Sequence, residues 1–143
     1  MKKKIVENYS YEGLGFPVNL SQVEMVYINN EWHPKIDVRK VSEKVIKTLV
    51  SQEKKLTGNQ IKFIRTYFSM TLREFAKNVV HESHTAVNKW ERFENKATNM
   101  DPNIEAMLRL YIYEKTCVKT EKQKSNFFKK YLEIKRLFPL QAN

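Results

Sequence analysis

The sequence predicts a mainly helical α+β chain, with a small antiparallel β lobe first, a four- or five-helix domain next and an extra helix at the C-terminus. The first thirty or so residues are typical of strands, since Phe16, Val18 and Leu20 alternate with polar or small neighbours, which is the period of a half-buried strand. From residue 38 onward they recur every three or four positions, as on one face of a helix. Three glycines and four prolines in 143 residues supply too few tight turns for an all-β chain.

The β lobe is expected within residues 1–55. Residues 16–20, in which apolar side chains alternate with polar or small ones, predict one strand. Residues 23–28 are β-branched and apolar, and the pair Asn29-Asn30 after them is typical of a hairpin turn. Pro34 ends the pairing because proline lacks an amide hydrogen.

One helix is expected to complete this lobe. Asp37 can cap it by accepting hydrogen bonds from the first-turn amides. A polar stretch at residues 51–55 marks the end of the helix and the boundary of the lobe. The apolar stripe of this helix comprises Val38, Val41, Val45, Ile46 and Leu49.

Residues 56–116 are expected to form the second domain, in which each helix has a recognisable start. Thr57 with Gln60, and Thr71 with Glu74, have the spacing of capping boxes. Ser83 caps a third helix and Asp101 a fourth. The apolar side chains expected to face inward are Ile61, Phe63, Ile64, Tyr67 and Phe68, then Leu72, Phe75, Ala76 and Val79, then Ala86, Val87 and Trp90, and lastly Ile104, Met107, Leu108, Tyr111 and Ile112.

Residues 117–143 are expected to form a basic amphipathic helix, running from Lys119 to Phe138. From residue 116 onward, seven basic and two acidic side chains give this segment a net charge of +5. Its apolar residues must fold back on the chain or meet a partner, and we expect them to support a homodimer. These residues are Phe127, Phe128, Tyr131, Leu132 and Leu137.

Composition argues against several classes of protein. The longest apolar runs are four residues, and polar residues such as Glu7 follow the opening lysines, so we expect a soluble, cytoplasmic protein with no membrane contact. Cys117 is the only cysteine and there are three histidines, so no disulfide, metal site or cofactor is expected. The sequence has no phosphate-binding glycine loop, no nucleophile beside a base and no compact carboxylate pair, and we expect no enzyme.

The net charge of +10 favours a polyanionic partner. Two short helices, starting at Thr71 and at Ser83 and separated by three or four residues, are typical of a helix-turn-helix. In that motif the first helix crosses the phosphate backbone and the second lies in the major groove of double-stranded DNA. The second helix here covers about residues 83–93.

The segments 71–77 (TLREFAK) and 85–91 (TAVNKWE) resemble the core of the XRE/Cro-like helix-turn-helix family. That family has a small residue in the bracing helix, a valine or isoleucine in the recognition helix and an aromatic–Glu pair at its end. The residues at these positions are Ala76, Val87, Trp90 and Glu91. The resemblance spans residues 57–113 and implies a DNA-binding domain.

Residues 11–23, Trp32 and the helix from Asp37, followed directly by this domain, resemble the MqsA-type antitoxins over roughly residues 9–113. The resemblance implies a dimer that binds a palindromic operator and represses its own operon, and an N-terminal lobe that binds a toxin. The zinc-binding cysteine pairs of that family are absent, so this lobe must be held by packing alone. The longer turn at residues 80–82 matches the family.

The solvent-facing side of the predicted recognition helix provides the candidate base contacts. Asn88 has the amide for a bidentate contact with adenine, and Lys89 or Arg92 the donors for guanine. The resemblance places Thr85 and Lys89 where MqsA-type proteins use an Asn and an Arg on bases. The full candidate set on this helix is Ser83, His84, Thr85, Asn88, Lys89 and Arg92, and the candidate phosphate contacts are Lys62, Arg65, Arg73 and Lys77.

Other interpretations of these residues stay open. The same polar side chains also fit the solvent-exposed face of an ordinary surface helix. Val87 and Trp90 are expected in the core, and Glu91 is expected to pair with a basic group such as Arg65. A second function is a protein-binding module whose N-terminal lobe holds a toxin. RNA binding is a weaker hypothesis, because the sequence shows no aromatic-plus-basic sheet pattern. His81 and His84 lack a convincing third ligand for a metal.

Overall fold

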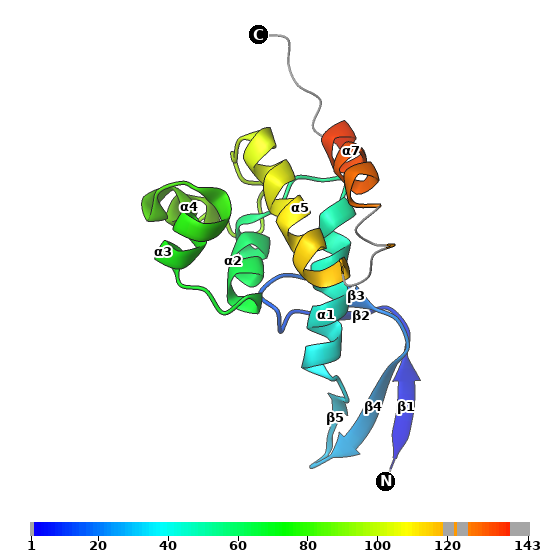
Figure 1. Cartoon of the computed structure of the whole chain (residues 1–143). Coiled ribbons are helices and arrows are strands. Elements are labelled where there is room, and N and C mark those ends of the chain that lie inside the picture. Colours follow the sequence, from blue (N-terminus) through cyan, green and yellow to red (C-terminus); the bar gives the residue numbers. More distant parts are fainter. Residues whose placement is uncertain (1, 119–121, 123–125, 138–143) are drawn as a thin grey trace. The chain divides into compact units, whose positions relative to one another are not determined.

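The computed structural model describes residues 2–118, 122 and 126–137 (Figure 1). The chain divides into two compact units, residues 1–43 and 44–143. This division falls inside the first helix, α1 (Val38–Thr48), twelve residues before the boundary expected near residue 55. The prediction of an α+β chain with a small antiparallel sheet is confirmed.

The first unit contains two small antiparallel sheets. In the larger sheet the strands lie in the order β1-β4-β5, side by side in Figure 1, and β2 pairs with β3 in the smaller one. Asn29 and Asn30 both have positive φ, 51° and 64°, and form the predicted hairpin turn between β4 and β5. The strands are β1 (Lys3–Val6), β2 (Tyr9–Tyr11), β3 (Val18–Leu20), β4 (Val23–Ile28) and β5 (Glu31–Pro34).

The strand expected over residues 16–20 is shorter than predicted, because β3 begins at Val18. Pro17 has no amide hydrogen to donate to a ladder, so pairing starts after it. Phe16 is nevertheless buried, at 5% exposure.

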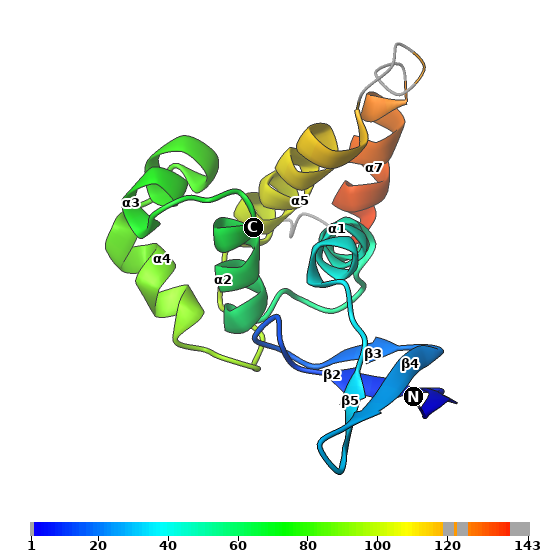
Figure 2. The same ribbon diagram turned by 90° about the horizontal axis from the view of Figure 1, so that it is seen from below.

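The second unit is helical and begins with the second half of α1, from Lys44. The short 3₁₀ helix η1 follows α1 directly, and α7 packs against α5, as Figures 1 and 2 both show. The elements after α1 are η1 (Leu49–Ser51), α2 (Gly58–Tyr67), α3 (Leu72–Phe75), the π-helical segment η2 (Ala76–Val80), α4 (His84–Glu91), α5 (Pro102–Cys117) and α7 (Phe127–Leu137).

All the predicted helix caps are confirmed. Thr57 and Thr71 each form a complete capping box, in which the hydroxyl accepts from the amide of Gln60 at 3.2 Å and of Glu74 at 3.1 Å. The Ser83 hydroxyl accepts from the Ala86 amide at 3.1 Å. The carboxylates of Asp37 and Asp101 accept from the amides of Lys40, at 3.2 Å, and Asn103, at 2.8 Å.

The helix expected to open at Thr71 differs in its second half. Only Leu72–Phe75 is α-helical, and the chain then widens into the π-helical turn of η2. His81 ends this segment in the left-handed region, with φ of 54°. Of the expected core residues, Phe75, Ala76 and Val79 are buried and Leu72 is half-buried.

α5 carries a charged pair within the core that the apolar pattern did not predict. Glu105 and Arg109 are both fully buried, 3.7 Å apart, whereas Met107 on the expected apolar face is 57% exposed. Arg109 donates to the carbonyl oxygens of Leu49 at 3.3 Å and Lys54 at 2.9 Å, and also to those of Val50 and Gln52. Glu105 accepts from the Leu56 amide at 2.7 Å. Burial raises the pKa of Glu105 and lowers that of Arg109, while each charge acts against the shift of the other.

The C-terminal helix is described as α7, which begins at Phe127 after a turn at Asn126. The expected helix from Lys119 is therefore interrupted, and residues 119–121, 123–125 and 138 of that prediction, with the side chains of Phe128 and Leu137, lie outside the described residues. Phe127 stacks on Tyr113 of α5, with ring centres 6.1 Å apart, and Ile134 is 1% exposed. Part of the apolar face thus folds back on this chain. None of the described helices has the length and apolar character needed to cross a membrane.

Candidate nucleic-acid interface

α4 is anchored through its buried face. Val87 is fully buried and Trp90 is 7% exposed, and α4 packs against both α2 and α3. The prediction that these two side chains belong to the core is confirmed. Because they are three residues apart on a helix, the opposite face of α4 points to solvent.

The solvent-facing side of α4 gathers the candidate base contacts. Five of the six predicted side chains are exposed, and Asn88 is half-buried. Within residues 83–92 the one acidic side chain is Glu91, which is turned toward Arg65. The exposed side of α4 is therefore made of hydroxyl, imidazole, amide and cationic groups. The exposed five are Ser83, His84, Thr85, Lys89 and Arg92.

A bidentate ion pair fixes the end of α4 to α2. The Nε and Nη2 atoms of Arg65 donate to the two carboxylate oxygens of Glu91 at 2.8 and 3.0 Å. Its Nη1 atom donates to the Met70 carbonyl oxygen at 3.0 Å, in the turn that leads to α3. The predicted partnership of Glu91 with Arg65 is confirmed. Arg65 is consequently occupied inside the fold, so we do not retain it among the candidate phosphate contacts.

The supporting helix adds cations beside α4. Arg73 on α3 and Lys77 on η2 are exposed, and both elements pack against α4. Lys62 on α2 is also exposed. All three cations are thus exposed, as a phosphate contact requires, and they remain candidates for that role.

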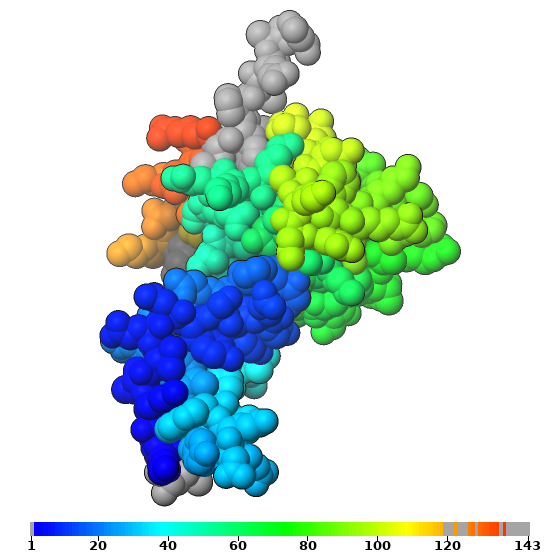
Figure 3. Space-filling view, turned by 180° about the vertical axis from the view of Figure 1, so that it is seen from behind, coloured from blue at the N-terminus to red at the C-terminus, as the bar shows by residue number. Residues whose placement is uncertain are grey.

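The chain after α4 returns to the start of α2. The Gly58 amide donates to the Lys96 carbonyl oxygen at 3.3 Å, and the Thr98 amide donates to that of Leu56 at 3.0 Å. In Figure 3 the yellow-green segment after α4 lies against the teal residues that precede α2. Gly58 permits this close approach, because a Cβ atom there would lie 2.5 Å from the Trp90 carbonyl oxygen and 2.6 Å from the Glu94 nitrogen.

We therefore expect Gly58→Ala to lower the free energy of unfolding by about 1–3 kcal/mol, since the added methyl group meets backbone that cannot rotate away. Urea denaturation followed by far-ultraviolet circular dichroism measures this. Lys62→Ala, at an exposed position of the same helix, is the control and should change stability by less than about 0.5 kcal/mol. A Gly58→Ala protein as stable as this control would contradict the packing described.

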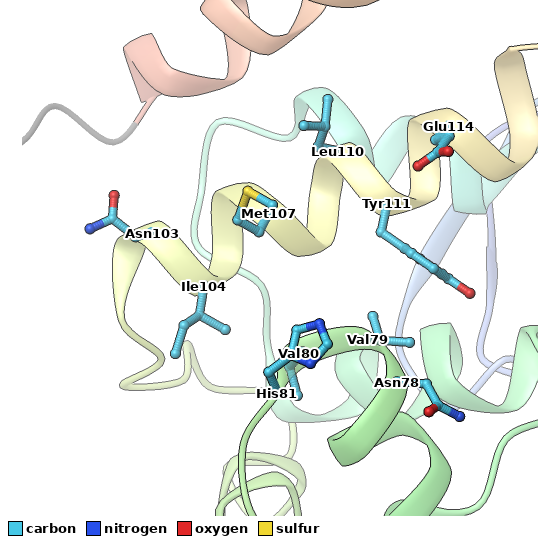
Figure 4. Close-up of a pocket in the computed structure, with 10 residues that line it drawn as sticks. All are labelled: Asn78, Val79, Val80, His81, Asn103, Ile104, Met107, Leu110, Tyr111 and Glu114. Carbon is cyan, nitrogen blue, oxygen red and sulfur yellow. The ribbon is translucent and has the colours of Figure 1, made fainter.

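A hollow of about 340 Å³ lies between η2 and α5. Figure 4 shows His81 and Glu114 well apart in it, with Val79 and Tyr111 among the side chains between them. The hollow therefore does not bring an acid and a base together. Its lining comprises Asn78, Val79, Val80, His81, Asn103, Ile104, Met107, Leu110, Tyr111 and Glu114.

His81 and His84 are both exposed on either side of the turn before α4. Among the residues that the structure describes, no three His, Cys, Asp or Glu side chains are grouped so that they could hold a metal ion.

The chain was compared with family models, curated proteins and solved structures. No match was found in any of the three.

Two features of the second unit were missed from the sequence, the π-helical turn and the buried Glu105–Arg109 pair. The second had a signal, because a Glu four residues before an Arg within an apolar helix is the spacing of an intrahelical ion pair. Nothing local in residues 76–80 distinguishes a π turn from an α turn.

Proposed function

We propose that the chain is a sequence-specific regulator of transcription that binds double-stranded DNA through a helix-turn-helix of the XRE/Cro-like type. In this proposal α3 and η2 cross the phosphate backbone, and α4 with the residues after it, about 83–93, lies in the major groove. The observation that carries the proposal is the two-sided character of α4. Its inner face is fixed by Val87, Trp90 and the Arg65–Glu91 pair, and its outer face presents side chains able to bind base edges and phosphates.

The roles of the outer side chains follow from their chemistry. An Asn side chain can form a bidentate pair with adenine, in which its amide nitrogen donates to N7 and its amide oxygen accepts from the N6 amino group, and Arg or Lys can donate to guanine O6 and N7. We assign Asn88, Lys89 and Arg92 to bases, with Thr85 and His84 beside them. Ser83 is placed at the helix N-terminus, where amides and the helix dipole favour a phosphate. Arg73 and Lys77 then contact the backbone.

The wider proposal concerns assembly and regulation. Proteins of this type read paired half-sites, so we propose a homodimer on a palindromic operator. The operator proposed is that of the chain's own operon, which the protein represses in the cytoplasm.

The proposal predicts that Asn88→Ala and Arg92→Ala each weaken binding to the duplex upstream of the protein's own gene by about 1–3 kcal/mol, because each removes a base contact. Fluorescence-anisotropy titrations against this duplex and a scrambled one of equal length, over a salt series, measure it. Lys47→Ala, an exposed cation on α1, is the charge-matched control and should retain the preference for the operator. Equal, steeply salt-dependent binding to both duplexes would overturn sequence-specific recognition.

The same titrations distinguish phosphate contacts from base contacts. Arg73→Ala and Lys77→Ala should weaken binding to both duplexes alike and reduce the slope of log affinity against log salt by about 0.9 each.

A second candidate function is the binding of a partner protein, such as a cognate toxin, by the first unit. The observation that favours it is an apolar set on one face of the β1-β4-β5 sheet, where Ile5 is 70% exposed, Ile28 is 43% exposed and Val26 lies on the same face. Under this alternative, Asn88→Ala/Arg92→Ala abolishes operator binding and leaves capture of the partner intact.

A further inference from the structure

The register of the β1-β4-β5 sheet collects two aromatic and two basic side chains on one face. Tyr27 lies opposite Trp32 on β5, and the Tyr27 amide donates to the Lys2 carbonyl oxygen at 3.1 Å on the other side. Lys4 lies opposite Met25, two residues from Tyr27 along β4, so it projects from the same face. These four residues, Lys2, Lys4, Tyr27 and Trp32, are called here the basic aromatic face.

The side chains of the basic aromatic face are in contact. The rings of Tyr27 and Trp32 are 5.2 Å apart, and the two ammonium groups lie over these rings, Lys2 at 5.3 Å from Tyr27 and Lys4 at 4.3 Å from Trp32. Tyr27 and Trp32 are half-buried residues, and both lysines are exposed. The rings therefore retain surface on which another flat group can stack, with positive charge beside it.

The acidic residues of this sheet lie on the face opposite the basic aromatic face. The acidic residues of its strands, Glu24 and Glu31, both project from the opposite face, where Lys3 pairs with Glu24 at 3.5 Å. The basic aromatic face thus carries positive charge that no acid of these strands neutralises. Such a face is complementary to a ligand that combines negative charge with flat rings.

We propose that the basic aromatic face binds single-stranded nucleic acid. Unpaired bases stack on Tyr27 and Trp32, and Lys2 and Lys4 move from the rings to the adjacent phosphates. A base-paired duplex keeps its bases stacked inside, so it cannot use the rings. Stacking and phosphate pairing read neither the sugar nor the base edges, so RNA and DNA strands are bound with similar affinity. This site is separate from α4 and does not depend on the function proposed for it.

The test uses the full chain and short fluorescein-labelled oligothymidylate and oligouridylate, titrated by fluorescence anisotropy. Lys2→Ala/Lys4→Ala should weaken binding of both strands roughly tenfold and reduce the salt slope by about 0.7 per lysine. Lys3→Ala is the control, because it removes one positive charge from the position between Lys2 and Lys4, on the opposite face of the sheet, and it should bind like the unmodified chain. Equal loss in Lys3→Ala would overturn the proposal.

A second variant tests stacking. Trp32→Leu should weaken binding by roughly 5- to 100-fold and abolish the quenching of tryptophan fluorescence by the oligonucleotide, because Trp90 is buried. If this variant does not fold, the lysine variants alone decide the outcome.

Three further results would overturn the proposal. They are no binding of either oligonucleotide, displacement of the strand by polyglutamate as effectively as by unlabelled oligonucleotide, and loss of single-strand binding in Asn88→Ala/Arg92→Ala. Conversely, Lys2→Ala/Lys4→Ala should keep its preference for the operator duplex, so failure at one site is distinguishable from failure at the other.

Discussion

Replacement of Arg109 by methionine should lower the free energy of unfolding by about 3–5 kcal/mol, the largest effect expected for an exchange in this chain. Methionine fills a similar volume, but it leaves Glu105 fully buried without its cation. It also removes the donor from four carbonyl oxygens, two in η1 and two in the segment between η1 and α2. Urea denaturation monitored by circular dichroism gives the value.

The double variant Glu105→Gln/Arg109→Met is the control for charge. It should lose less stability than Arg109→Met, because no buried charge is left, although the carbonyl oxygens still lack their donor. A loss of unfolding free energy under about 1 kcal/mol in Arg109→Met would contradict a stabilising role of Arg109 in the core.

The loss in Arg109→Met should also depend on pH. Burial raises the pKa of Glu105 above its ordinary value of 4.5, and Arg109 opposes this shift, so removal of Arg109 raises the pKa further. Between the ordinary and the raised pKa, the folded state holds a proton that the unfolded state has released. The free energy of unfolding therefore falls as the pH rises through this window, and the deficit is larger at about pH 8 than at about pH 5. Glu105→Gln/Arg109→Met should lack this dependence.

Arg65→Met should affect both stability and DNA binding. The pair with Glu91 is mostly buried, with 14% and 11% of the two side chains exposed, so an unpaired Glu91 costs about 2–4 kcal/mol of unfolding free energy. The same change releases the end of α4 from α2 and from the turn at Met70. We therefore expect the affinity for the operator to fall as well, although Arg65 itself contacts no DNA in the proposed complex.

Two measurements separate these effects. Denaturation gives the loss of stability, and anisotropy titration well below the melting temperature gives the affinity of the protein that is still folded. Lys62→Met on the same helix is the control for stability, since its side chain is exposed and has the same change of charge. An Arg65→Met protein with unchanged stability would contradict the anchoring role of the ion pair.

Local chemistry explains which parts of the fold were predictable. Caps depend on a hydroxyl or carboxylate two or three residues before a free amide, so Thr57, Thr71, Ser83 and Asp101 were identified from sequence alone. The Asn29-Asn30 turn follows in the same way from side chains that tolerate positive φ. The candidate site on α4 was predictable for the same reason, because its faces follow from a buried valine and tryptophan three residues apart.

Features that depend on distant partners were not predictable. No aromatic-plus-basic sheet pattern is visible in the sequence, because Lys2 and Lys4 are more than twenty residues from Tyr27 and Trp32 and meet them only through strand register. Arg109 was not identified as a core residue because its partners are backbone carbonyl groups, which no residue type reveals. Arg65 fitted two roles by sequence, and only the structure assigned it to the interior.

The backbone hydrogen bonds between residues 56–59 and 94–98 have a consequence for how this protein can change over evolutionary time. The chain enters the group α2, α3, η2 and α4 and leaves it at one place, since Thr57 and Ala97 form a bridge and Leu56 accepts from Thr98. A substitution within the segment 59–94, or an insertion in the turn before α4, changes the backbone or side chains of that segment. The two ends of the segment stay joined by these bonds. The exposed residues of α4 can therefore be exchanged, and the binding preference of this face can change, while the segments before and after the loop keep their sequence and packing.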